Sequence, residues 1–155
     1  MNKIFLDIGQ YITKADNGIV YSVLGSCLGI IFYDKDKKFG CFCHGFLPSC
    51  NMGSCNFGCL QDTKYVNCAI EKMVKDFSKR NLNLSKAFIA VIGGGNLIKS
   101  TSAQGNTIGE LNIQSALKTL AKYNLKPTFM DIGDKKARKF FFNIKTGELK
   151  VESIN

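Results

Sequence analysis

Short hydrophobic runs separated by polar turns fill the first third of the chain. Residues 18–24, 27–34 and 39–48 carry apolar or alternating side chains, and the turn "DKDKK" (34–38) separates the second run from the third. Runs of this length bounded by turn residues are typical of β-strands. We therefore predict three strands, followed by a loop rich in Gly, Ser, Asn and Cys at residues 49–59.

The hydrophobic period becomes helical after Thr63 and stays so to about Arg80. One face of this segment is apolar, with Val66, Ile70, Met73 and Phe77. This is the pattern of an amphipathic helix that lies on a sheet, and Cys68 falls on its opposite face. A second helix is indicated by four further apolar positions, Ile113, Leu117, Leu120 and Ala121.

The second half of the chain alternates these helices with further strands. Residues 86–95 read as a strand that ends in three glycines, and residues 125–133 read as another. Residues 139–154 form a predicted hairpin whose turn contains Gly147 at a positive φ angle. Mixed strands with two helices predict the fold class, an α/β sandwich with a mixed sheet.

Size and composition favour one domain over residues 1–155. With 155 residues and 45% hydrophobic side chains, the chain can bury a core without disulfides or metals. No apolar stretch approaches the roughly 20 residues that cross a membrane, and the N-terminus lacks the pattern of a secretory signal. We expect a cytoplasmic protein with no direct membrane insertion, whose seven cysteines are reduced.

The net charge of +9 raises the question of nucleic acid. The lysines are dispersed, however, and lack the interleaved aromatic side chains with which single-strand binders stack bases. We therefore expect no nucleic-acid partner. A solvated basic surface is the simpler interpretation, and an acidic protein partner is the alternative.

Cys27 and His44 are candidates for nucleophilic catalysis. Cys27 follows two small residues in "GSC", and His44, the only histidine, lies seventeen positions later. A free thiol has a pKa of about 8.5 and needs a neighbouring base, which His44 supplies if the second and third strands pair. Both residues have a structural alternative, since free cysteine and lone histidine are often buried without a chemical role.

The remaining cysteines suggest a competing metal or redox site. Cys41 and Cys43 point to one face of a strand and His44 to the other, so these three do not readily hold one ion. Loop cysteines are better candidates, namely Cys50, Cys55 and Cys59. The glycines of "GGGN" (93–96) match no phosphate-loop pattern, and we expect close backbone packing there.

Several motifs together resemble the CheD family, the chemoreceptor glutamine deamidases of bacterial chemotaxis. They span nearly the whole chain: "LGSC" (24–27), "YD" (33–34), "HGFLP" (44–48), "KY" (64–65), "IAVIGGG" (89–95) and "DIGDKKARKFFFNIKTGELKV" (131–151). The resemblance implies that Cys27 is the nucleophile and His44 its base. It also implies a fold similar to the catalytic domain of cytotoxic necrotizing factor toxins, and no cofactor.

The same resemblance implies two partners. The substrate would be the cytoplasmic helices of a chemoreceptor, whose glutamines become glutamates, with methyl-ester hydrolysis as a possible side activity. The second partner would be a CheC-type phosphatase. Three functions therefore stay open: an active deamidase, a weakly active regulator of CheC, and a metal- or redox-responsive protein.

One position departs from the family pattern. CheD proteins commonly carry a threonine six residues before the cysteine as a third catalytic group, and this chain has Tyr21 there, with Ser22 next. A tyrosine hydroxyl lies farther from the backbone. Ser22 would face the other side of a regular strand and would need a bulge to take the role. A backbone carbonyl that orients His44 is the remaining option. The cysteine-rich loop at residues 49–59 is also unlike the family.

Overall fold

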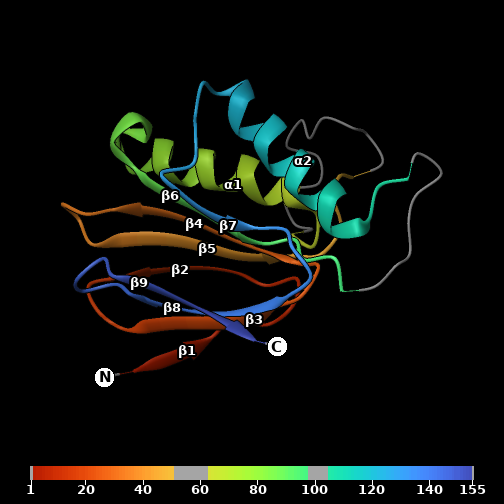
Figure 1. The fold of residues 1–155 in the computed structure, drawn as a ribbon. Coiled ribbons are helices and arrows are strands. Elements are labelled where there is room, and N and C mark those ends of the chain that lie inside the picture. Colours follow the sequence, from red (N-terminus) through yellow and green to blue (C-terminus); the bar gives the residue numbers. More distant parts are fainter. Residues whose placement is uncertain (1, 51–62, 98–104, 155) are drawn as a thin grey trace.

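Two helices, a five-stranded sheet and a four-stranded sheet form three stacked layers (Figure 1). This computed structural model describes residues 2–50, 63–97 and 105–154. The five-stranded sheet has the order β2 (Tyr11–Ala15), β5 (Phe39–Gly45), β4 (Leu28–Asp34), β6 (Phe88–Gly93) and β7 (Phe129–Ile132). The four-stranded sheet has the order β1 (Lys3–Phe5), β3 (Ile19–Leu24), β8 (Ala137–Asn143) and β9 (Leu149–Ile154).

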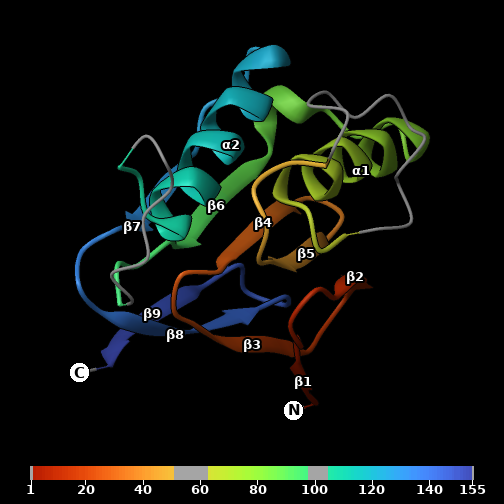
Figure 2. The ribbon, with the colours of Figure 1, turned by 90° about the vertical axis from the view of Figure 1, so that its right-hand side faces the viewer.

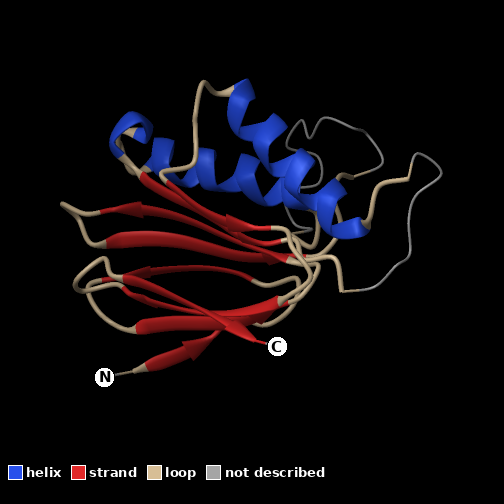
Figure 3. Ribbon diagram, viewed as in Figure 1, coloured by secondary structure: helices blue, strands red, loops and turns tan. Residues whose placement is uncertain are grey.

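Both sheets are mixed, and the helices cover only one of them. The β6–β7 and β1–β3 pairs are parallel, and the other strand pairs are antiparallel. Figures 2 and 3 show α1 (Val66–Lys79) and α2 (Ile108–Lys122) on the outer face of the five-stranded sheet. The predicted α/β sandwich with a mixed sheet is confirmed. None of the helices within the described ranges is long and apolar enough to cross a membrane.

The predicted elements are present, with shorter bounds and some additions. The first helix begins at Val66 because the preceding residues bond to the chain after β5, where Lys64 O accepts from the N–H groups of Phe46 and Leu47. Gly147 has the expected positive φ of 78° in the turn between β8 and β9. The prediction missed β1 and β2, together with a 3₁₀ turn at Leu84–Lys86.

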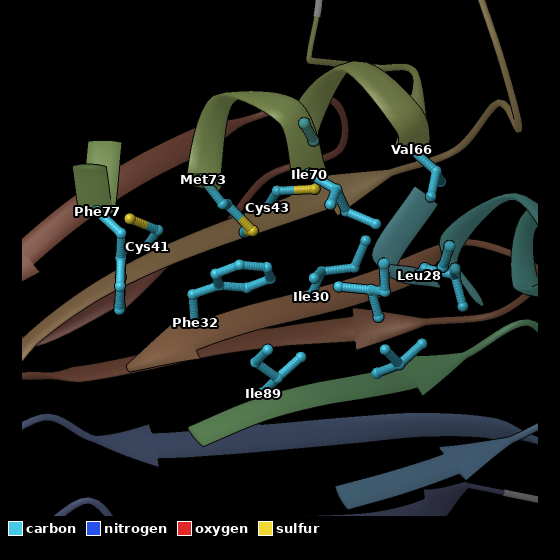
Figure 4. Packing of buried hydrophobic residues seen from close by; sticks show 14 of the residues in the cluster. Leu28, Ile30, Phe32, Cys41, Cys43, Val66, Ile70, Met73, Phe77 and Ile89 are labelled. Atoms are coloured by element: carbon cyan, nitrogen blue, oxygen red, sulfur yellow. The ribbon is translucent and has the colours of Figure 1, made fainter. Parts of the chain in front are cut away.

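The helix-facing core explains two of the cysteines. Cys41 and Cys43 are fully buried beside Ile70, Met73 and other side chains of the same cluster, between α1 and the sheet (Figure 4). Burial raises the pKa of each thiol to about 12, so neither is a thiolate at neutral pH. Both cysteines serve as small apolar residues here.

A second core fills the space between the two sheets. Phe42 and Ile31 from one sheet meet Phe140 and Phe142 from the other. In β8 the side chains alternate, so Arg138 also points inward and is fully buried. Residues on these two inner faces, and on the loops that follow them, form the site described next.

Candidate active site

Cys27 lies in the turn that joins the two sheets, directly between β3 and β4. Its side chain is partly exposed and packs at the margin of the core between the sheets. Small residues precede it, and a side chain at Gly25 would come within 3.2 Å of Leu97. The thiol is thus on the inner side of the sandwich, at an edge that solvent can reach.

Strand pairing brings His44 to the same place. β4 and β5 are antiparallel, and the register puts Gly29 directly opposite His44. Cys27 precedes Gly29 by two residues, so its side chain and that of His44 lie on the same face as diagonal neighbours. Gly29 has no side chain between them, and a Cβ there would come within 2.9 Å of Phe140. The second and third strands do pair, which was the condition for bringing His44 close to Cys27.

Ser22 connects to His44 from the other sheet. Its Oγ lies 2.9 Å from Nδ1 of His44 and 2.6 Å from the carbonyl oxygen of Leu6. The one hydroxyl proton goes to the Leu6 carbonyl, which only accepts, so Ser22 Oγ accepts from a protonated Nδ1. We therefore assign the Nδ1–H tautomer to His44, which leaves Nε2 as the basic nitrogen.

Tyr21 lies on the opposite face of β3. Its ring stacks on Phe141, with centroids 6.0 Å apart, and contacts Phe5 at 5.3 Å. The expectation that Ser22 needs a bulge is wrong, because β3 pairs with β8 in unbroken register. The reason is that the site lies between the sheets, on the inward face that Ser22 already occupies. Leu6 O, at 3.4 Å from Nδ1, supplies the backbone carbonyl that the sequence left as an option.

Burial favours the neutral forms of the Cys27 thiol and the His44 imidazole. It lowers the pKa of His44, against opposing effects of the Leu6 carbonyl and the charge of Asp7. It raises the pKa of the Cys27 thiol, partly offset by a hydrogen bond from the backbone N–H of Cys27. The arrangement is a thiol and a neutral imidazole, in which the imidazole can take the thiol proton during attack.

All three carbonyls of the Gly25–Ser26–Cys27 turn are hydrogen-bonded. Gly94 N donates to Cys27 O and Gly95 N donates to Gly25 O, each at 2.9 Å. The side-chain Nδ2 of Asn112 donates to Ser26 O at 3.0 Å. The turn therefore has a fixed backbone conformation, which sets the direction of the backbone N–H groups beside Cys27.

The glycine run after β6 makes this contact possible, as expected from its sequence. Gly93 has φ +111°, and a Cβ there would lie 2.2 Å from the carbonyl oxygen of Cys27. On the other side, Gly109 of α2 packs directly on the loop, since its Cβ would lie 2.5 Å from Gly94 O. Arg138 supports the same loop, with Nη1 at 3.5 Å from Gly93 O and Nε at 2.9 Å from Asp131.

Sequence reasoning missed Asn112 and Arg138 as parts of the site. The apolar positions used to predict α2 gave the helix correctly, but its fully buried residues include the polar Asn112. A buried amide on a helix face is a signal that periodicity of apolar residues does not use. Arg138 lies within the motif at residues 131–151 that resembles the CheD family, and sequence reasoning assigned it no role.

The proposed metal cysteines are only partly within the described residues. Cys50 and Cys68 are buried in a small cluster with Tyr65, and Asn67 contacts the sulfur of Cys50 at 3.7 Å. Cys55 and Cys59 lie outside the described residues, as does most of the loop predicted at 49–59. Among the described residues, no three His, Cys, Asp or Glu side chains are grouped to hold a metal ion.

Comparison with known families identifies the chain. Residues 47–153 match the family model described as CheD chemotactic sensory transduction. The chain belongs to the CheD family. The matched stretch begins three residues after His44, so the roles of Cys27 and His44 rest on the geometry above and on the resemblance of their motifs.

Named relatives of the CheD family match over almost the full length. The chain is 28% identical to the probable chemoreceptor glutamine deamidase CheD of Maridesulfovibrio salexigens, over 99% of this chain and 93% of that protein. It is 27% identical to the chemoreceptor glutamine deamidase CheD of Thermotoga maritima, with the same coverage. A probable CheD 1 of Shewanella oneidensis is 30% identical over 94% of this chain and 69% of its own.

Proposed function

We propose that this protein is a chemoreceptor glutamine deamidase that uses Cys27 as nucleophile and His44 as general base. The observation that carries the proposal is the triple contact of Ser22, His44 and Leu6, which holds the imidazole and leaves Nε2 basic. A buried histidine with only a structural role does not require a neighbouring thiol, yet Cys27 lies two residues from its strand partner. The names of the relatives support glutamine as the substrate.

The reaction then follows the logic of acyl transfer. As the Cys27 sulfur forms a bond to the carbonyl carbon of the glutamine γ-carboxamide, its proton moves to Nε2 of His44. The C–N bond breaks, and His44 returns the proton to the leaving nitrogen, which departs as ammonia. Water, deprotonated by His44, then attacks the thioester, so that glutamate forms and the proton returns to the Cys27 sulfur. No cofactor takes part in these steps.

Backbone donors beside Cys27 would stabilise the negative oxygen of each tetrahedral intermediate. The turn is fixed through its carbonyls, which leaves its N–H groups oriented before substrate binds. Donors that are already in place need no reorganisation when charge develops. This preorganisation is the contribution of the Gly25–Cys27 turn to the reaction.

The test is mass spectrometry of a chemoreceptor cytoplasmic fragment after incubation with the protein. Wild type converts specific glutamines to glutamate, a mass increase of about 1 Da per site, whereas Cys27→Ala and His44→Ala do not. Cys43→Ala is the matched control, because Cys43 adjoins His44 in β5 but faces the helices. Conversion by Cys27→Ala, or none by folded wild type with a bound fragment, contradicts the proposal.

The other implied properties stay predictions of the same proposal. They are a cytoplasmic location, methyl-ester hydrolysis and binding to a CheC-type phosphatase. Cys27→Ala distinguishes the regulator from the enzyme, since it removes deamidation and leaves phosphatase binding intact. Metal analysis of protein purified under reducing conditions tests the metal- or redox-responsive alternative.

A further inference from the structure

Asn112 of α2 bonds to the segments that carry both reacting residues. Its Nδ2 donates to the carbonyl of Ser26, directly before Cys27, at 3.0 Å. The same nitrogen lies 3.4 Å from the carbonyl of Phe46, two residues after His44. One side-chain amide thus connects the turn that carries Cys27 with the segment that follows His44 at the end of β5.

The burial of Asn112 is otherwise unexplained by packing. The residue is fully buried in the second turn of α2, and its Oδ1 has no hydrogen-bond partner among the described residues. Leaving a buried acceptor unpaired costs about 1–3 kcal/mol. An apolar residue of similar size would avoid this cost but would take the Nδ2 donor from the carbonyl of Ser26, so the amide is accounted for by that bond and not by packing.

The bond to Ser26 acts on Cys27 through the peptide plane. The carbonyl of Ser26 and the N–H of Cys27 belong to one planar unit, in which they point in opposite directions. Holding the oxygen therefore fixes the direction of the N–H. That N–H contacts the Cys27 sulfur and lowers the pKa of the thiol.

We propose that Asn112 is a positioning residue of the active site, which orients the Ser26–Cys27 peptide unit relative to His44. The effect on catalysis that this inference predicts rests on the proposed function. The side chain of Asn112 makes no hydrogen bond to Cys27 and takes no part in proton transfer. It holds the nucleophile and its adjacent N–H in the attacking geometry.

Ser115 provides a matched control one turn further along α2. Its hydroxyl donates to the carbonyl of Pro48, so it also ties the helix to the segment after β5. Ser115 is buried, and its bond does not reach the Cys27 turn. If the bonds of Asn112 and Ser115 only hold the helix in place, replacing either residue should change the reactivity of Cys27 to a similar extent. If Asn112 positions Cys27, only its replacement should change that reactivity.

The experiment measures alkylation of Cys27 by iodoacetamide as a function of pH. Trypsin releases residues 15–35 as one peptide in which Cys27 is the only cysteine, so mass spectrometry follows this thiol separately from the other six. Asn112→Ala removes the amide, and Asn112→Asp keeps its shape while replacing the donor by an acceptor. Thermal unfolding is recorded for each variant.

Both Asn112 variants are expected to shift the pH profile of Cys27 upward and slow its alkylation near pH 7 on the order of tenfold. In the deamidation assay, kcat falls about 10- to 100-fold while KM changes little, because the attacking geometry is lost and binding is not. Ser115→Ala keeps the wild-type pH profile and kcat.

Three results would overturn the inference. One is a wild-type alkylation profile in both Asn112 variants, and the second is an equal shift in Ser115→Ala. The third is unfolding of both variants, which would make Asn112 a residue of the core. Alkylation needs no substrate, so a profile altered only in the Asn112 variants of a protein without deamidase activity supports the positioning of Cys27 and contradicts the proposed function.

Discussion

Ser22 and His44 belong to different sheets, and their side chains meet with 2.9 Å between Oγ and Nδ1. The contact is completed by Leu6, whose carbonyl accepts from Ser22. Ser22 therefore orients the imidazole from its Nδ1 side and fixes its tautomer, as the third catalytic group of the proposed site would.

Removal of the Ser22 hydroxyl is expected to reduce deamidation strongly. Ser22→Ala leaves Nδ1 with only the longer contact to Leu6, and we expect kcat to fall about 10- to 100-fold. Ser22→Thr keeps a hydroxyl and retains most of the activity. Tyr21→Phe serves as the control, because Tyr21 lies on the outer face of β3, and its kcat stays at the wild-type value. Equal losses in Ser22→Ala and Tyr21→Phe would refute the assignment.

The pH profile of kcat/KM reports the ionisation of His44 in the free enzyme. Catalysis requires the neutral imidazole, so activity rises with pH through the pKa of His44. Burial lowers that pKa, and the midpoint of the acid limb is therefore expected below about 6.5, the ordinary value of histidine. His44→Ala abolishes this limb together with the activity. A wild-type midpoint at or above about 6.5 would contradict the burial of His44 described above.

Gly93→Ala is expected to disrupt the turn of the nucleophile. The new methyl group would lie 2.2 Å from Cys27 O at a backbone φ of +111°. We expect a loss of about 3–5 kcal/mol in the free energy of unfolding, together with loss of activity. Gly133→Ala is the matched control, since Gly133 also has a positive φ but no atom near its Cβ position. It should cost only about 1–2 kcal/mol, measured by urea denaturation.

The helix-facing core contributes stability without touching the site. Phe77 of α1 is fully buried against Phe32 and Phe39, with ring centroids 5.8 and 6.0 Å away. Phe77→Ala is expected to lower the free energy of unfolding by about 3–5 kcal/mol. The folded fraction should keep its kcat, because Phe77 lies on the face of the sheet opposite His44. A fall in kcat at full folding would show that the two cores are coupled.

Periodicity predicted most of the fold, because alternating and helical patterns persist along single elements. Register was accessible only as a hypothesis, since the pairing of β4 with β5 determines whether Cys27 and His44 share a face. Ser22 was a candidate partner of His44 only with a bulge in its strand. Its direct contact could not be predicted, because it joins two sheets and no local pattern in the sequence shows how sheets pack. The role of Asn112 could not be predicted for the same reason, because its two hydrogen-bond partners lie 86 and 66 residues away in the sequence.

The division of the site between two sheets and a helix has a consequence for refolding. The segments that bear Ser22, His44 and Asn112 can each form hydrogen-bonded structure with their neighbours. The contacts that join these segments exist only once the layers have closed on one another. Contacts between distant segments form late when chain closure opposes them. Recovery of deamidation after dilution from denaturant is therefore a direct reporter of the final docking of the layers, distinct from the return of secondary structure.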